Sequence, residues 1–155
     1  MESGRAGVPT SASLVCTAGG RRCALPVGHV IETMRPLPVE LVVGVPDFVA
    51  GLALIRGAPT PVVDLGRLLG ATAAAPWGRF VVVAAGGRRV ALAVDAVLGV
   101  RALDAAALEA LPPLVEDAAG PIAALAALDG ELLVVIRGAR LVPEAALEAL
   151  SRAGR

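Results

Sequence analysis

Residues 18–27 read Ala-Gly-Gly-Arg-Arg-Cys-Ala-Leu-Pro-Val, and residues 85–94 repeat them almost unchanged as Ala-Gly-Gly-Arg-Arg-Val-Ala-Leu-Ala-Val. Eight of the ten positions are identical, at an offset of 67 residues, and Val30 matches Val97 at the same offset. A second block, residues 52–63, resembles residues 125–136 at an offset of 73. Two matching blocks in the same order favour an internal duplication over chance, so we predict two similar structural units.

Each block predicts a β-hairpin. Apolar runs precede both Gly-Gly pairs, and glycine supplies the positive φ angles that a two-residue turn requires. Gly57 and the Asp129-Gly130 pair predict two further hairpins. Pro59 and Pro61 cannot donate to a ladder and should lie at an edge or a strand start. The expected strand pairs are 14–18 with 22–27, 80–85 with 89–94, 52–55 with 61–65, and 124–128 with 132–136.

Helices should be short and few. Asp64 is expected to cap a single turn that stops at Gly70, and Asp104 to cap a helix over residues 105–111. We therefore predict a mainly β fold of two small subdomains, about residues 13–75 and 76–142, which could share strands. Residues 1–12 should form a flexible leader and residues 143–155 a C-terminal helix.

Composition excludes several classes of function. The 155 residues carry 14 Lys+Arg and 14 Asp+Glu, so there is no net charge to attract nucleic acid. All the basic residues are arginine, which excludes lysine-based catalysis, and aromatic residues make up 2% of the chain. Mean hydropathy is high at +0.75, yet no stretch of about 18 apolar residues lacks charges or breakers. We predict a cytoplasmic protein with no direct membrane insertion.

Candidate chemical groups are sparse. A two-residue turn would place Cys16 opposite Cys23, where either a disulfide or two buried thiols could form; a reducing cytoplasm favours thiols. With His29 they supply only three ligands without metal-site spacing. The serines lie at positions 3, 11, 13 and 151, away from any base. Glu32, Asp64 and Asp95 are interpreted as caps or surface charges. We predict no catalytic residues, no metal and no cofactor, and retain a redox-sensing or metal-binding module of Cys16, Cys23 and His29 as the alternative.

Apolar residues exceed what two small interiors need. Strand-like runs at residues 27–31, 41–45 and 94–100 predict an apolar groove between the subdomains that receives a partner. A small-molecule ligand in the same groove is a third option.

One segment resembles a known family. It reads Gly51-Leu52-Ala53-Leu54-Ile55-Arg56-Gly57-Ala58-Pro59-Thr60-Pro61-Val62-Val63-Asp64-Leu65 after Val45-Pro46-Asp47-Phe48-Val49. Together with Val94-Asp95-Ala96-Val97-Leu98-Gly99-Val100, it is similar to the motifs of the CheW-like domain family, over about residues 13–142.

The resemblance implies two five-stranded, SH3-like barrels about a shared core. It also implies a stand-alone, non-enzymatic adaptor that couples chemoreceptors to the chemotaxis histidine kinase in arrays at the inner face of the membrane. Its partners would be the cytoplasmic tip of the receptor and the regulatory domain of the kinase. By position, the receptor-binding residues would be Val27, Val30, Glu32, Arg56, Val97 and Leu98. The kinase-binding residues would be Val42, Val43 and Val45.

Overall fold

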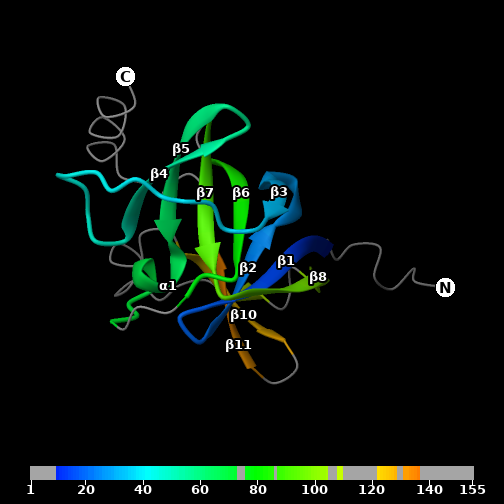
Figure 1. Ribbon diagram of the computed structural model, residues 1–155. Helices are drawn as coiled ribbons and strands as arrows, with labels where there is room; N and C mark the ends of the chain where they lie inside the picture. Colours follow the sequence, from blue (N-terminus) through cyan, green and yellow to red (C-terminus); the bar gives the residue numbers. More distant parts are fainter. Residues whose placement is uncertain are drawn as a thin grey trace.

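The computed structural model describes residues 10–72, 76–85, 87–104, 108–109, 122–128 and 131–136. Over these ranges the chain is mainly β, as predicted, with little helix (Figure 1). The elements are β1 (Thr10–Ala18), β2 (Arg21–Pro26), the 3-10 helix η2 (Val27–His29), β3 (Val30–Met34), β4 (Val49–Ile55), β5 (Ala58–Asp64), α1 (Leu65–Leu68), β6 (Arg79–Ala85), β7 (Arg88–Val94), β8 (Ala96–Asp104), β9 (Leu108–Glu109), β10 (Ile122–Leu128) and β11 (Glu131–Ile136).

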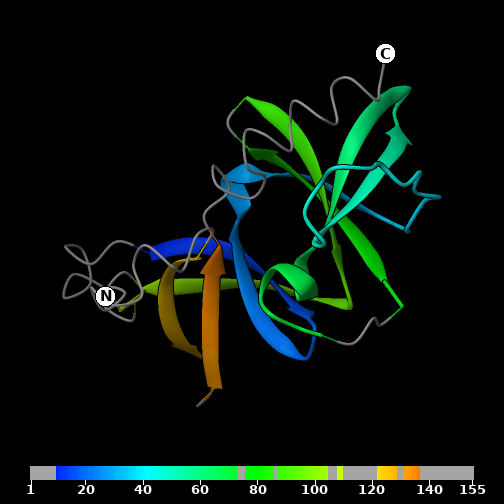
Figure 2. The same cartoon turned by 90° about the vertical axis from the view of Figure 1, so that its left-hand side faces the viewer.

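The strands form two mixed sheets. The six-stranded sheet has the order β8-β1-β2-β11-β10-β9, and the five-stranded sheet has the order β3-β6-β7-β5-β4. In each sheet two hairpins meet through one parallel pair, β2 with β11 or β7 with β5. Figure 2 shows this exchange as an orange strand, β11, beside the blue β2. Each sheet therefore takes strands from both sides of residue 75.

Strand register confirms the internal repeat. Val62 pairs with Ala91 in one sheet, and their equivalents Val135 and Ala24 pair in the other. Likewise Val30 pairs with Val83, and Val97 with Cys16. The two sheets therefore reuse the same pairings, with each first-block hairpin joined to a second-block hairpin from the other half of the chain.

β-Bulges also recur at equivalent positions of the repeat. The β3–β6 ladder skips Ile31, and the β1–β8 ladder skips Leu98, its equivalent at the offset of 67. A second bulge, at residue 50 in β4, recurs at residue 123 in β10, at the offset of 73. Bulges that recur at equivalent positions are built into the fold rather than accidental.

The main hydrophobic core lies between the sheets. Residues 80–83 of β6 are all buried. Because neighbours in a strand point to opposite faces, both faces of the five-stranded sheet are covered at this strand. Val81 and Val83 face the six-stranded sheet in the largest cluster, whereas Phe80 and Val82 face a separate cluster on the other side. The largest cluster combines residues of both sheets: Leu14, Cys16, Ala18, Cys23, Leu25, Val134 and Ile136 from one, and Val49, Val63, Val81, Val83, Val90, Leu92 and Val94 from the other.

This core takes up only part of the apolar surplus that the sequence assigned to a groove. From the runs 27–31, 41–45 and 94–100, these valines lie in the core or pack against it: Val30, Val42, Val45, Val94 and Val97. The other large apolar side chains of these runs are exposed: Val27, Ile31, Leu41, Val43, Leu98 and Val100.

Over the residues that the structure describes, the ladders do not close into the implied five-stranded barrels. The segment after β3 returns to β4 only at an isolated bridge, where Glu40 and Leu52 exchange hydrogen bonds of 2.8 and 2.9 Å. Pro36 and Pro38 lie on this segment and have no N–H, so a continuous ladder from β3 cannot form there. The other sheet has six strands rather than five.

Three further expectations differ from the structure or lie outside it. Leu108–Glu109 form β9, paired with β10, instead of part of a helix over residues 105–111; the pairing outweighs the cap signal at Asp104. β1 begins at Thr10, inside the expected leader 1–12, because β8 is long enough to pair with it there. The expected helix over residues 143–155 lies outside the described residues.

Candidate interaction site

Glu32 and Arg56 form a two-point ion pair. Arg56 Nε donates to Glu32 Oε2 at 3.1 Å, and Arg56 Nη2 donates to Oε1 at 2.7 Å. Glu32 lies on β3, and Arg56 lies in the turn that follows β4, so the contact connects the two edge strands of the five-stranded sheet. The sequence placed both residues in one site but did not predict that they touch.

Arg56 has an unusual backbone conformation. Its φ is 53° and that of Gly57 is 78°, so both central residues of this two-residue turn are left-handed. Such turns favour asparagine or glycine, and an arginine there is energetically costly. Residues held in an unfavourable backbone conformation cluster at functional sites. The conformation of Arg56 therefore supports the expectation that this residue has a role beyond the turn.

The ion pair sets the charge of Glu32. Hydrogen bonds from Arg56 lower the pKa of the Glu32 carboxyl below its usual value, and the charges of Arg56 and Arg89 lower this pKa further. Glu32 is consequently ionised at neutral pH, and Arg89 is a third charged group at this end of the sheet.

The apolar residues expected to bind the receptor divide into two groups. Val30 and Val97 are half-buried and pack against the core between the sheets. Val27 and Leu98 are exposed, Val27 on η2 and Leu98 at the bulge of β8. Ile31 and Val100 are also exposed; both end apolar runs that the sequence assigned to a groove, but neither was selected as a receptor-binding residue, although Ile31 is equivalent to the selected Leu98. Ile31 and Leu98 are 40% and 45% exposed, so the two bulges turn similar side chains outward.

The three residues expected to bind the kinase lie on the loop between β3 and β4. Val42 and Val45 are half-buried and pack against the core between the sheets. Val43 is 97% exposed, and its neighbour Leu41, which the sequence analysis did not select, is 85% exposed. The loop therefore presents two large apolar side chains to solvent while its other valines hold it to the core.

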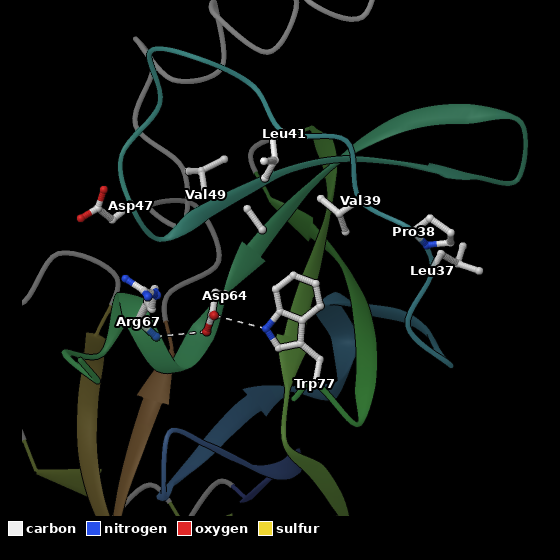
Figure 3. Close-up of a pocket in the computed structure, with 10 residues that line it drawn as sticks. Leu37, Pro38, Val39, Leu41, Asp47, Val49, Asp64, Arg67 and Trp77 are labelled. Carbon is white, nitrogen blue, oxygen red and sulfur yellow. Dashed lines mark hydrogen bonds between the residues drawn. The ribbon is translucent and has the colours of Figure 1, made fainter. Parts of the chain in front are cut away.

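A cavity of about 620 Å³ opens beside this loop (Figure 3). Val39 and Leu41 line one side, and Trp77 lies opposite Arg67. Asp64 uses both carboxylate oxygens here: Oδ1 accepts from the backbone N–H of Arg67 at 3.1 Å, and Oδ2 accepts from Trp77 Nε1 at 3.2 Å. Asp64 thus caps α1, as predicted, and also fixes the indole ring that walls the cavity.

The cysteines and histidine do not form a joint site. Cys16 and Cys23 are directly opposite in the β1–β2 ladder, as predicted, and both are buried free thiols. Hydrogen bonding to Cys23 and burial raise the pKa of the Cys16 thiol, which disfavours the reactive thiolate. His29 is exposed on η2. In the part of the chain that the structure describes, no three His, Cys, Asp or Glu residues are grouped to hold a metal ion.

Comparison with known proteins identifies the family. A family model described as the CheW-like domain matches residues 12–146. The chain belongs to the CheW-like domain family. This match covers the repeated hairpins, both sheets and the loop that carries Leu41.

A solved structure has the same CheW-like fold. The crystal structure of the scaffolding protein TtCheW from Thermoanaerobacter tengcongensis matches with a TM-score of 0.74 and 23% sequence identity, over 83% of this chain and 89% of that chain. No curated protein matches by sequence. Membership in the CheW-like family supports an adaptor role in chemotaxis signal transduction. None of the described helices has the length and apolar character that crossing a bilayer requires.

Proposed function

We propose that this chain is a non-catalytic cytoplasmic adaptor that couples chemoreceptors to the chemotaxis histidine kinase in arrays at the inner face of the membrane. The match of the CheW-like family over residues 12–146 carries the proposal. The described site favours protein binding over turnover, because its features are exposed apolar side chains and an arginine held at a turn.

On the receptor side, the two bulges offer a pair of equivalent anchors. Ile31 and Leu98 are exposed next to Val30 and Val97, which join the core. A bulge re-aims a side chain relative to the regular alternation of the strand. A helical receptor tip could therefore bury Ile31, Leu98 and Val27 while Val30 and Val97 keep the surface rigid. Arg56, with Glu32, would contribute the polar contact.

On the kinase side, Leu41 and Val43 are better candidates than Val42 and Val45, the other two valines selected from the sequence. Both side chains are almost fully exposed, and burying such residues contributes about 1.5 to 3 kcal/mol each. Val42 and Val45 would then support the loop from beneath rather than contact the kinase.

Binding measurements with charge-introducing variants test the receptor proposal. Leu98→Arg and Ile31→Arg place a charge in a surface that must become dry on binding, so each should weaken affinity for a receptor signalling fragment about tenfold or more. Leu54→Arg is the matched control, because Leu54 is also exposed but lies on β4. Equal affinities for all three variants would exclude the bulges as the receptor site.

Kinase activation tests Arg56 separately. In a reconstituted mixture of receptor, kinase and this chain, Arg56→Ala should reduce kinase activity while circular dichroism shows an unchanged fold. Normal activation by Arg56→Ala would remove this residue from the functional site.

The adaptor and the redox-module hypotheses predict opposite reactivities for the thiols of Cys16 and Cys23. Because both are buried and the thiolate of Cys16 is disfavoured, native protein should react with a thiol reagent far more slowly than unfolded protein. Rapid labelling of the native protein, or a stable loss of two protons measured by mass, would favour the redox module over the adaptor.

A further inference from the structure

A cleft separates the first residues of β5 from those of β7. It has a volume of about 250 Å³ and is lined by Ala58, Pro59, Thr60, Pro61, Arg88 and Arg89. The two strands are neighbours in the sheet, yet their parallel ladder begins only at the pair Val62 and Ala91. The cleft lies where the two strands are adjacent but are not joined by ladder hydrogen bonds.

Pro61 explains why the ladder stops. In a hairpin with a two-residue turn, Ile55 and Ala58 form a hydrogen-bonded pair, so the backbone groups of Pro59 and Pro61 point away from β4 and towards β7. Arg89 is in the matching position on β7, with its backbone groups directed towards β5. The next ladder bond would need an N–H from Pro61, which has none.

The other sheet shows what happens without the proline. At the offset of 73 the equivalent of Pro61 is Val134, and Val134 pairs with Cys23 on β2. The parallel ladder of that sheet therefore extends one residue further towards the turn than the ladder of β5 and β7. The chain thus contains two versions of the same parallel strand pair, and the hydrogen-bonded ladder begins one residue further from the turn in β5–β7 than in β2–β11.

Two arginines border the cleft between β5 and β7. Arg88 and Arg89 are exposed, and neither guanidinium makes a hydrogen bond or an ion pair involving the described residues. The acidic group near them is Glu32, whose two oxygens are already bound by Arg56. Among the described residues, this end of the five-stranded sheet therefore keeps an unneutralised positive charge, in a protein with no net charge.

We propose that this cleft binds carboxylate side chains of an acidic segment on a signalling partner. The inference rests on the adaptor function proposed above. The planar guanidinium matches a carboxylate in two-point geometry, as the Arg56–Glu32 pair demonstrates in this molecule. Strand addition is excluded here because two prolines remove the donors that an incoming strand would need.

A polyphosphate partner fits less well. Nucleic acid or an anionic membrane is bound by an extended basic face, and each additional phosphate contact needs another cation. Here two arginines flank a small cleft, with the Glu32 carboxylate nearby. An acidic protein segment of a few residues matches this charge and size.

Direct titration with a hexaglutamate peptide tests the cleft without any partner protein. The peptide should shift the backbone amide signals of Ala58, Thr60 and residues 87–89, and raising the salt concentration should abolish the shifts. The double variant Arg88→Glu with Arg89→Glu should lose them. Stronger binding of an oligothymidylate or of anionic vesicles than of hexaglutamate would overturn the carboxylate proposal, as would unchanged shifts in the double variant.

A matched control comes from the repeat. Arg21 occupies the same place in the first copy of the motif as Arg88 in the second, and it is also exposed. Against a receptor signalling fragment and a kinase regulatory domain, Arg88→Glu should weaken at least one affinity about tenfold, whereas Arg21→Glu should leave both near the wild-type value. Equal effects of the two variants would overturn the proposal. Failure of the wild-type chain to bind either protein would instead overturn the adaptor function, and the hexaglutamate titration would still decide the cleft.

A variant that closes the cleft but keeps both arginines tests whether binding depends on the shape of the cleft as well as on its charge. Pro61→Val supplies the missing N–H and copies the sister sheet, so slow hydrogen exchange of the amide introduced by this substitution would show that the ladder has lengthened. The same variant should then bind hexaglutamate several-fold more weakly although both arginines remain. Undiminished binding by a variant with a protected amide would show that the cleft is not the site.

Discussion

The two copies of the Ala-Gly-Gly-Arg-Arg motif each connect an antiparallel strand pair, but their surroundings differ. The first turn, at Gly19 and Gly20, packs against α1: an added Cβ at Gly19 would lie 2.8 Å from Ala71 Cβ and 3.1 Å from Gly66 Cα. Gly20 also donates to Asp95 Oδ2 at 3.3 Å. In the second turn an added Cβ at Gly87 would meet nothing within 4 Å, as at its equivalent Gly20, but the equivalent of Asp95 is Gly28, which has no side chain to accept from the turn.

The contrast shows that one sequence can serve two purposes. The first turn fastens the six-stranded sheet to the helix that follows β5 in the other sheet. The second turn lacks the carboxylate bond, because Gly28 stands in place of Asp95, and its arginines border the cleft beside β5. A repeated motif thus needs its surroundings, and not only its sequence, before a role can be assigned to it.

Substituting the turn glycines should produce the largest difference. Gly19→Ala combines an unfavourable left-handed φ of 58° with a clash against Ala71 and Gly66, so it should lower the free energy of unfolding by about 2 to 4 kcal/mol. Gly87→Ala has the backbone cost alone, about 1 kcal/mol. Urea unfolding of both variants measures the difference, and equal losses would show that the first turn is not packed on α1.

Removing the cap of α1 should have the next largest effect, because α1 is the surface on which the first turn rests. Asp64→Ala loses the bond to the backbone of Arg67 and leaves the half-buried Trp77 N–H without its acceptor, which should cost about 1 to 3 kcal/mol. Asp64→Asn keeps an oxygen acceptor and should lose less. Thermal unfolding with tryptophan fluorescence would report both; an unchanged emission maximum in Asp64→Ala would contradict the contact.

A smaller effect is expected where Asp95 meets the first turn. The Gly20 N–H to Asp95 bond is long and exposed, so Asp95→Ala should cost only about 0.5 kcal/mol. Gly28 stands at the equivalent position for the second turn, and no side chain there could make the same bond. Faster hydrogen exchange of the Gly20 amide in Asp95→Ala, with the Gly87 amide unaffected, would be the sharper readout.

The smallest effect is a pH dependence at the end of the molecule that carries the second turn. Because the folded-state pKa of Glu32 lies below its unfolded value, the stabilisation by Arg56 is fully present above about pH 4.3 and is lost as the pH falls through the lowered pKa. Wild type and Glu32→Gln should therefore differ in Tm at pH 7 and converge in strong acid. A difference that persists at low pH would show that Glu32 stabilises the fold by other means.

Local features of the fold could be predicted because they depend on neighbouring residues. The Gly-Gly turns determine that Cys16 faces Cys23, and Asp64 was recognised as a cap from the strand before it and Gly70 after it. The prolines of β5 were expected at an edge or a strand start. Pro59 lies near the start of β5, but β5 is an interior strand and Pro61 lies in its middle, just before the parallel ladder with β7 begins.

Long-range features could not be predicted from local pattern. Nothing near residue 24 indicates that β2 pairs with β11, and nothing near Glu32 indicates that Arg56 will reach it. Within the apolar runs assigned to a groove, hydrophobicity alone did not distinguish side chains that pack on the core, such as Val42, from exposed neighbours such as Val43. The exposed positions of Ile31 and Leu98 depend on bulges, which alternate patterning does not reveal.

The exchange of hairpins between the halves also constrains how the chain is made. During synthesis β2 leaves the ribosome early, but its parallel neighbour β11 is the last of the described strands to emerge. The six-stranded sheet must therefore stay incomplete until β11 has been translated, and its apolar face needs temporary protection in the meantime. A nascent chain halted before residue 131 should consequently bind chaperones that the released protein does not.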